Sequence, residues 1–127
     1  MPERFLKQSE PVVVPTEDEK HIEEHFGIPS TGMKDISIAR MIAPPGWSEP
    51  PQTPEFDEFT LMVRGRKRIY VEDREIELGA GESLLVTAGT RVRYSNPWDE
   101  PAEYWSVCRP AFSPDRVHRE EDPEEDS

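Results

Sequence analysis

Short apolar segments alternate with turn-forming residues through the middle of this 127-residue chain. Alternating or continuous apolar positions, rich in β-branched and aromatic residues, are typical of β-strands. The glycine, proline, asparagine and aspartate residues between these segments favour turns. The pattern predicts seven strands, over residues 36–42, 58–63, 66–72, 75–78, 83–86, 91–95 and 102–108. Short strands at this spacing indicate an all-β sandwich or barrel.

The N-terminal part of the chain does not share this pattern. Residues 12–14 are three valines flanked by prolines, which fits an edge strand or an arm better than a central strand. Residues 17–26 allow two interpretations. Thr16 and Glu19 have the spacing of a capping box and Gly27 supplies a stop, which favours a short helix. The same residues also fit an extended edge segment.

The C-terminal end is strongly acidic and contains few apolar residues. Such a segment cannot bury enough apolar surface to offset the entropy of its chain, so we expect a disordered acidic tail. The length of the chain suits one domain with one hydrophobic core. The sequence therefore predicts an N-terminal arm with a possible short helix over 1–34, a barrel over 35–112 and a tail over 113–127.

Composition narrows the choice of partners and compartment. Fifteen basic and 27 acidic side chains give a formal net charge of −12, which repels phosphate backbones and anionic lipids, so neither nucleic acid nor membrane is expected as a partner. Cys108 is the single cysteine and is expected to be a buried, inert thiol. The chain begins without a signal-like segment and contains no long apolar run, which predicts a cytoplasmic protein.

Six residues between Gly46 and Asn96 fit a pair of spaced motifs. The first motif is Gly-x5-His-x-His-x3-Glu-x6-Gly and the second is Gly-x5-Pro-x-Gly-x2-His-x3-Asn. The residues that match them are Gly46, Glu58, Gly65, Gly81, Gly89 and Asn96. In these two spacings the chain resembles the cupin family, whose members are small antiparallel jelly-roll β-barrels. The resemblance implies a cupin-type jelly-roll barrel, with both motifs facing its interior.

The resemblance also implies where a metal would bind. In family members that bind Mn, Fe, Ni or Zn, two histidines and a glutamate of the first motif converge with one histidine of the second. Here Gln52, Pro54 and Val92 stand at the histidine positions and only Glu58 remains. Proline and valine offer no donor atom, so a barrel without a metal cofactor is the favoured interpretation.

The alternative is a metal site with unusual ligands. In that interpretation Glu58 and Gln52 hold a divalent transition metal together with His25 or His118, folded over the barrel mouth from outside the motifs.

Strand alternation predicts the residues around the cavity, because residues two apart face the same side. Glu58 is the candidate catalytic residue, since burial would raise its pKa and suit it to general acid or base chemistry; it is equally consistent with a structural carboxylate satisfied by hydrogen bonds. The residues expected to contact a ligand are Gln52, Met62, Val92, Tyr94 and, at the rim, Trp47.

The basic run from Arg64 to Arg68 is interpreted as a solvated hairpin, with Arg68 or Tyr70 as the side chain that could point inward. Residues 59–63 are apolar on both faces, which indicates a strand that is covered twice. Many cupins pair sheet to sheet, so a homodimer is expected.

The leading functional hypothesis is a cytoplasmic cupin that binds a small organic molecule in its cavity, with metal-independent acid–base catalysis as its chemistry if it is an enzyme. The alternatives are a metal-dependent isomerase, lyase or dioxygenase, and a binding or assembly protein without catalysis.

Overall fold

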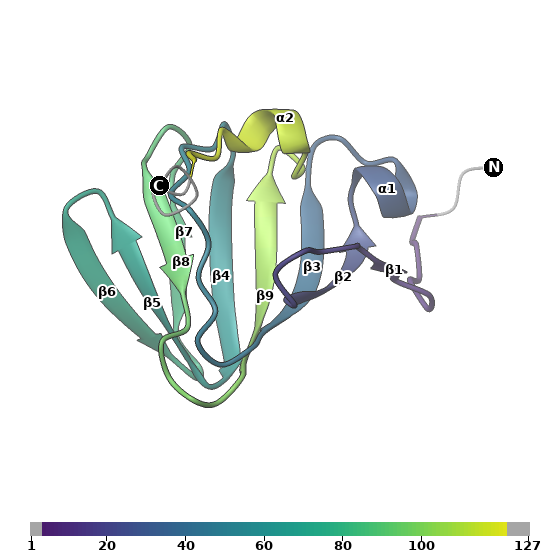
Figure 1. Cartoon of the computed structure of the whole chain (residues 1–127). Helices are drawn as coiled ribbons and strands as arrows, with labels where there is room; N and C mark the ends of the chain where they lie inside the picture. Colours follow the sequence, from purple (N-terminus) through teal and green to yellow (C-terminus); the bar gives the residue numbers. More distant parts are fainter. Residues whose placement is uncertain (1–3, 122–127) are drawn as a thin grey trace.

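The computed structural model describes residues 4–121 as antiparallel strands in two sheets, with two single-turn helices (Figure 1). One sheet has six strands in the order β1-β2-β3-β9-β4-β7, and the other has three in the order β6-β5-β8. The strands are β1 (Val12–Val13), β2 (His21–Phe26), β3 (Ser37–Ala43), β4 (Asp57–Arg64), β5 (Arg66–Val71), β6 (Arg74–Gly79), β7 (Ser83–Val86), β8 (Val92–Ser95) and β9 (Ala102–Arg109), and the helices are α1 (Ile28–Thr31) and α2 (Pro114–Val117). The all-β jelly-roll prediction is confirmed.

The seven strands predicted from the hydrophobic pattern correspond to β3 through β9, each boundary within one residue. The motif glycines explain why the turns fall where they do. Gly65 joins β4 to β5 with a φ of +74°, and a Cβ at this position would lie 2.4 Å from the carbonyl oxygen of Pro101. Both the backbone conformation and the close approach require glycine.

Asn96, the last residue of the second motif, has a structural role. Its side chain is fully buried, and Nδ2 donates hydrogen bonds to the carbonyl oxygens of Pro44 (3.2 Å) and Glu100 (2.8 Å). Its Oδ1 accepts a hydrogen bond from the backbone N–H of Trp98 at 3.3 Å. Asn96 therefore links two loops by hydrogen bonds at one end of the barrel. This structural role accounts for its place in the motif without any contact to a ligand.

The helix interpretation of residues 17–26 is wrong, and the extended alternative is confirmed. Residues 21–26 form β2, which pairs with β3 from His21 opposite Ile42 to Phe26 opposite Ile38. The free edge of β3 offers backbone partners to this segment, whereas an isolated helix of ten residues is only marginally stable. β1 then pairs with β2 and adds a further strand, so the six-stranded sheet begins well before residue 35.

The C-terminal segment is ordered further than expected. Residues 114–117 form α2, and the following residues run beside the segment over 51–53, where the backbone N–H of Glu120 donates to the Pro51 carbonyl at 2.8 Å. Residues 114–121 are therefore ordered rather than part of a disordered tail, and the rest of the predicted tail, over 122–127, lies outside the described residues.

The core lies between the two sheets. It combines side chains of the six-stranded sheet, such as Met62 and Tyr104, with side chains of the three-stranded sheet, such as Ile69, Leu78 and Tyr94. Over residues 4–121, neither helix has the length or apolarity needed to span a membrane.

Candidate functional site

The interior face of β4 carries the residues that the sequence placed there. β4 pairs with β9 so that Glu58 lies opposite Cys108, Thr60 opposite Ser106 and Met62 opposite Tyr104. Directly opposed residues project from the same face of a sheet, so these three pairs form an inward-facing ladder. The ladder places one carboxylate among hydroxyl, thiol and apolar groups.

The Glu58 carboxylate is half-buried and held by one side chain. Ser106 is buried and its Oγ donates a hydrogen bond to Glu58 Oε2 at 2.7 Å. A hydrogen bond to the second oxygen is not found among residues 4–121. Cys108 lies 3.9 Å from Ser106 Oγ, and burial together with the Glu58 charge raises the pKa of its thiol far above the usual range. Cys108 is thus a buried thiol of low reactivity, as predicted.

Tyr94 closes the site from the three-stranded sheet. Its side chain is 2 % exposed, and its hydroxyl is buried without a hydrogen-bond partner in the described part of the chain. Burial, then the charge of Glu58 and its proximity to the hydroxyl, raise the pKa of Tyr94 well above the usual value, so the phenol stays protonated; the geometry between the two groups does not meet that of a hydrogen bond. A buried hydroxyl without a partner costs about 1–3 kcal/mol of stability, which is unusual in a folded core.

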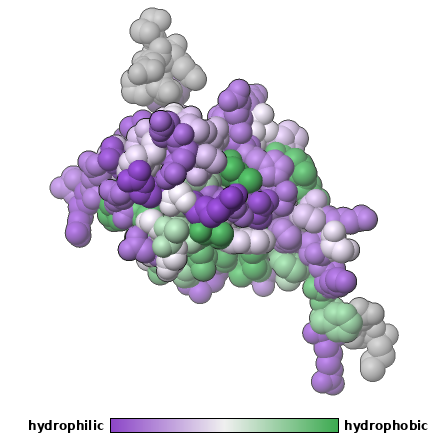
Figure 2. Space-filling model, turned by 90° about the horizontal axis from the view of Figure 1, so that it is seen from below, coloured by the Kyte–Doolittle hydropathy of each residue, from purple (hydrophilic) through white to green (hydrophobic). Residues whose placement is uncertain are grey.

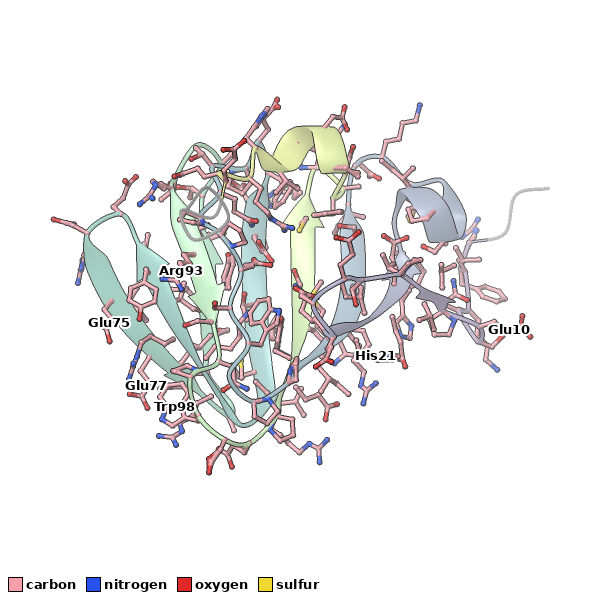
Figure 3. All side chains as sticks on the ribbon, viewed as in Figure 1. Glu10, His21, Glu75, Glu77, Arg93 and Trp98 are labelled. Atoms are coloured by element: carbon pink, nitrogen blue, oxygen red, sulfur yellow. The ribbon has the colours of Figure 1, made fainter. Side chains whose placement is uncertain are left out.

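Lys67 is the residue of the site that sequence reasoning missed. In β5 the inward positions are Lys67 and Ile69, both buried, so the idea that Arg68 or Tyr70 points inward is wrong by one residue of register. Arg68 faces outward instead. The guanidinium groups of Arg68 and Arg66 lie 5.1 and 4.2 Å from the ring centroid of Trp98, which is labelled in Figure 3. The apolar Ile69 two residues on was the available signal for the correct register.

The Lys67 side chain ends among aromatic rings. Its Nζ lies 3.7 Å from the ring centroid of Tyr104, 4.3 Å from that of Tyr94 and 5.8 Å from that of Trp47. No carboxylate within residues 4–121 lies close enough for an ion pair with it. Burial, followed by the positive charge of Lys20, lowers the pKa of Lys67 to about 7, although Glu58 and Glu49 oppose this effect.

Trp47 is buried in the same cluster, beneath the segment that precedes β2. Its Nε1 donates a hydrogen bond to Asp18 at 2.7 Å, and Lys20 Nζ lies 4.6 Å from its ring centroid. Lys20 is fixed in turn by Glu49 at 3.5 Å. Although partial burial opposes it, the Trp47 hydrogen bond lowers the pKa of Asp18. The expected rim residue is therefore covered by residues 18–20 rather than open to solvent.

Gln52 and Val92 are buried side by side and joined by their backbones. The N–H of Gln52 donates to the Val92 carbonyl at 2.9 Å, and the N–H of Val92 donates back at 2.8 Å. The side-chain oxygen of Gln52 accepts a hydrogen bond from Arg119 at 3.2 Å. Its amide is therefore engaged by the C-terminal segment.

The histidines do not assemble around Glu58. His25 contacts Trp105 with the rings tilted and their centroids 5.0 Å apart, and Trp105 lies opposite Leu61 on the outer face of the six-stranded sheet. Glu58 is on the inner face, so the sheet separates the two. His118 is exposed and pairs with Glu55. His21, labelled in Figure 3, pairs with Glu23 on β2.

The alternative set of metal ligands, Glu58 and Gln52 with His25 or His118, is thus not brought together. A group of three or more His, Cys, Asp or Glu side chains suited to a metal ion does not occur in the described ranges. At the motif positions themselves, Gln52, Pro54 and Val92 do not fit the family's histidine ligands.

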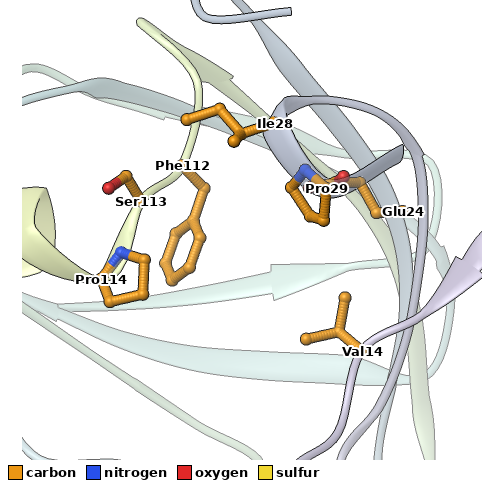
Figure 4. Close-up of a pocket in the computed structure, with 7 residues that line it drawn as sticks. All are labelled: Val14, Glu24, Ile28, Pro29, Phe112, Ser113 and Pro114. Atoms are coloured by element: carbon orange, nitrogen blue, oxygen red, sulfur yellow. The ribbon is translucent and has the colours of Figure 1, made fainter. Parts of the chain in front are cut away.

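A separate pocket lies where the N-terminal strands meet the loop before α2 (Figure 4). Its volume is about 180 Å³, and Val14, Ile28, Phe112 and Pro114 supply much of its apolar lining. The one carboxylate, Glu24, already accepts a hydrogen bond from the Ser30 N–H at 3.0 Å. The pocket is smaller than the roughly 300 Å³ of typical ligand sites and offers no free polar group, so we do not assign it a ligand.

Comparison with known proteins agrees with this fold. The polyketide cyclase RemF from Streptomyces resistomycificus superposes with a TM-score of 0.73 at 18 % identity, over 98 % of this chain and 92 % of that one. Oxalate decarboxylase from Bacillus subtilis superposes with a TM-score of 0.74 at 16 % identity, over 90 % of this chain and 31 % of the enzyme. At such identities the likeness concerns the fold alone.

A curated relative is more similar in sequence. It is named endoribonuclease YbeY, from Myxococcus xanthus, and is 48 % identical over 108 residues, which is 85 % of this chain. The match spans 37 % of that protein's length, so the name describes a protein of which this chain resembles one part. The profile of the cupin domain matches residues 39–108, more than half of the chain and both motifs. The chain therefore belongs to the cupin family.

Proposed function

We propose that this cupin binds a small polar organic molecule in the interior of its barrel, beside Glu58. The observation that carries the proposal is the Tyr94 hydroxyl, which is buried with no hydrogen-bond partner in the described structure. Buried polar groups in native proteins nearly always have partners, and an exception calls for an explanation. A ligand oxygen that accepts a hydrogen bond from Tyr94 would supply the missing partner.

Glu58 supplies the chemistry that such a site can perform. Ser106 orients its carboxylate, and the second oxygen is left to accept a proton from a bound molecule or to return one. A positioned carboxylate beside a bound molecule is suited to general acid–base catalysis, which needs no redox metal. Any catalysis at this site would therefore move protons on a small molecule.

The net charge argues against a nucleic-acid substrate. At −12 the chain repels phosphate backbones, so we do not extend the endoribonuclease name of its relative to this chain. A small molecule, bound in the cytoplasm, remains the partner that we propose.

A homodimer is part of this proposal. Leu61, Val63 and Leu85 lie on the outer face of the six-stranded sheet and are each about 45 % exposed. Trp105 and Phe59 extend this apolar surface, since Leu61 pairs with Trp105 and Phe59 with Leu85. Figure 2 shows hydrophobic residues gathered along one side of the molecule. A second copy would cover such a surface, which water leaves unfavourably exposed.

The test combines the detection of a bound ligand with binding measurements on two variants. Native mass spectrometry of untagged protein would detect a co-purifying small molecule, and a thermal-shift screen would cover small carboxylic acids, carbonyl compounds and sugars. We expect at least one compound to raise the Tm of the wild type and to do so much less in Glu58→Gln and Tyr94→Phe. The hydrogen bonds lost are worth about 1–3 kcal/mol, or roughly 5- to 150-fold in affinity.

The matched controls are Glu55→Gln, an exposed carboxylate on the same segment, and Tyr70→Phe, an outward-facing tyrosine of β5. Both should bind like the wild type. Equal binding by all four variants, or no ligand for the wild type, would contradict the proposed site.

A further inference from the structure

We propose that Lys67 forms an imine with a carbonyl group of the ligand, which makes small aldehydes and ketones the substrate class of the interior site. The inference rests on the proposed function, because it needs a ligand to enter the same interior. It adds a second reactive group, on the opposite sheet from Glu58.

The placement of Lys67 is the first argument. Lysine is almost never fully buried unless it is paired, yet Lys67 is 2 % exposed and has no ion pair within the described residues. The rings of Tyr104 and Tyr94, at 3.7 and 4.3 Å, take the place of a carboxylate. An apolar side chain of similar length would fill the position at lower cost in stability. A functional use of the amine explains why the lysine is there.

Two features of the surroundings favour the neutral, nucleophilic amine. Burial removes the water that would solvate an ammonium, and Lys20 places a second positive charge over the Trp47 ring, 4.6 Å from its centroid. Desolvation and a neighbouring cation are the two means by which proteins activate a lysine toward carbonyl compounds. The pKa of Lys67, at about 7, agrees with this geometry.

The same aromatic rings suit the product of the reaction. An iminium ion keeps the positive charge on the lysine nitrogen after the carbonyl carbon has been attached. The faces of Tyr104 and Tyr94 stabilise a cation at this position by cation–π attraction. The rings therefore offset part of the cost of burying this charge, in the iminium as in the ammonium.

The step balances without an oxidant or a reductant. The Lys67 ammonium first gives a proton to a water molecule that enters with the ligand, and the neutral amine attacks the carbonyl carbon to form a C–N bond while the C=O electron pair moves to oxygen. One further N–H proton passes to that oxygen, and water returns the first proton to it. The C–O bond then breaks, water leaves, and the nitrogen lone pair completes the iminium.

Residues 18–20 cover Trp47 and thereby limit the access of a ligand to Lys67. Asp18 accepts the Trp47 hydrogen bond and is itself exposed, so a substitution at Asp18 removes this contact of the cover without changing a residue of the sheets. Removal of the Asp18 carboxylate should therefore speed the reaction of Lys67 with a carbonyl compound.

Reductive trapping tests the inference. The folded chain of 127 residues is treated at pH 7 with glyoxylate and sodium cyanoborohydride, and the labelled lysines are located by peptide mass spectrometry. The chain has four lysines, of which Lys7 and Lys34 are exposed and serve as internal controls. At pH 7 the neutral fraction of Lys67 is about a thousand times that of an ordinary lysine, so we expect it to be labelled first despite its burial.

Two variants complete the test. Lys67→Arg retains a cation but cannot form an imine, so its labelling should be confined to the other lysines. Asp18→Ala should accelerate labelling of Lys67. Circular dichroism is used to check that both variants are folded. If Lys67 stays unmodified in the wild type and in Asp18→Ala while a ligand from the screen still binds, the imine is wrong and the proposed function stands. If neither ligand nor label is found, both fail.

Discussion

Each face of the six-stranded sheet carries residues that are unusual for its side. The inner face, which normally holds only apolar side chains, carries Glu58 and faces the hydroxyl of Tyr94 and the amine of Lys67. The outer face, which normally meets water with polar side chains, exposes Leu61 and Leu85. Each arrangement costs stability in an isolated chain, because it buries polar groups without partners or leaves apolar surface in water.

The unusual residues on each face indicate that each face requires a partner. Polar groups that lack partners inside the barrel are suited to a small polar ligand, and apolar groups outside are suited to another protein surface. The two requirements are independent, because the sheet separates them. Substitutions on one face should therefore leave the behaviour of the other unchanged, and this separation can be tested.

The largest effect is expected from Leu61→Asp on the outer face. In a symmetric dimer the substitution occurs twice, and each copy loses about 2 kcal/mol of apolar burial and gains a desolvated carboxylate. The dissociation constant should rise about 1000-fold, which sedimentation equilibrium would measure. Met33→Asp, at an exposed position after α1, is the control and should not change the association. A wild-type chain that is already monomeric at high concentration would contradict the outer-face interpretation.

The next effect is expected from Lys67→Met on the inner face, measured as the free energy of unfolding against pH. A folded-state pKa of about 7, below the ordinary value near 10.5, means that the unfolded chain binds more protons between these pH values. Wild-type stability should therefore rise with pH in this window, and the methionine variant should lack the rise. The groups that face Lys67 are Lys20, Glu49, Glu58, Tyr94 and Tyr104.

The variant should be more stable than the wild type by on the order of 4 kcal/mol at pH 6, and the gap should shrink by about 1 kcal/mol per pH unit above 7. Urea unfolding at pH 6, 8 and 9 measures it. Lys34→Met, at an exposed position, should show no gap at any of these pH values. A gap for Lys67→Met that does not change with pH would mean that the buried amine is not titrating in this range.

Lys67 also shows where sequence reasoning reaches its limit. The strands of the barrel were predictable because apolar alternation and turn glycines are local signals, and β3 to β9 follow them. A lysine between two arginines resembles a solvated hairpin, although the apolar Ile69 two residues on indicates the register in which Lys67 faces inward. A charged residue that faces inward contradicts the very pattern from which faces are inferred.

The helix prediction for the N-terminal segment was wrong for a different reason. Residues 17–26 have the end signals of a helix, and the partner that makes them a strand, the free edge of β3, is not visible in their own sequence. The cover over Trp47 is hidden in the same way, because the Asp18 contact joins residues 29 positions apart. Glu58 was identified because a family motif records its spacing, and Tyr94 because strand alternation places it on the same face as a motif position, whereas no motif records what lies opposite them.

A smaller effect is expected from Tyr94→Phe. Removal of a buried hydroxyl that has no partner should leave the stability unchanged or raise it by about 1 kcal/mol, since no hydrogen bond is lost and a polar group is no longer buried. Ligand binding should weaken at the same time, so stability and affinity move in opposite directions. Thermal unfolding with and without the ligand measures both. A clear loss of stability in the free protein would show that the hydroxyl already has a partner, and the main argument for the interior site would fall.

The smallest effect is expected from His118→Ala, which tests whether the C-terminal segment contributes to the inner face. His118 pairs with Glu55 at the surface, with both side chains more than half exposed, and exposed pairs of this kind contribute about 0–1 kcal/mol. The variant should change the free energy of unfolding by less than about 1 kcal/mol, and elemental analysis of untagged protein should give the same metal content as the wild type. Stoichiometric metal that disappears in His118→Ala would instead mean that the C-terminal segment moves over the barrel and brings this histidine to Glu58. In that case the inner face would hold its ligand through a metal, and the C-terminal segment would be part of the interior site.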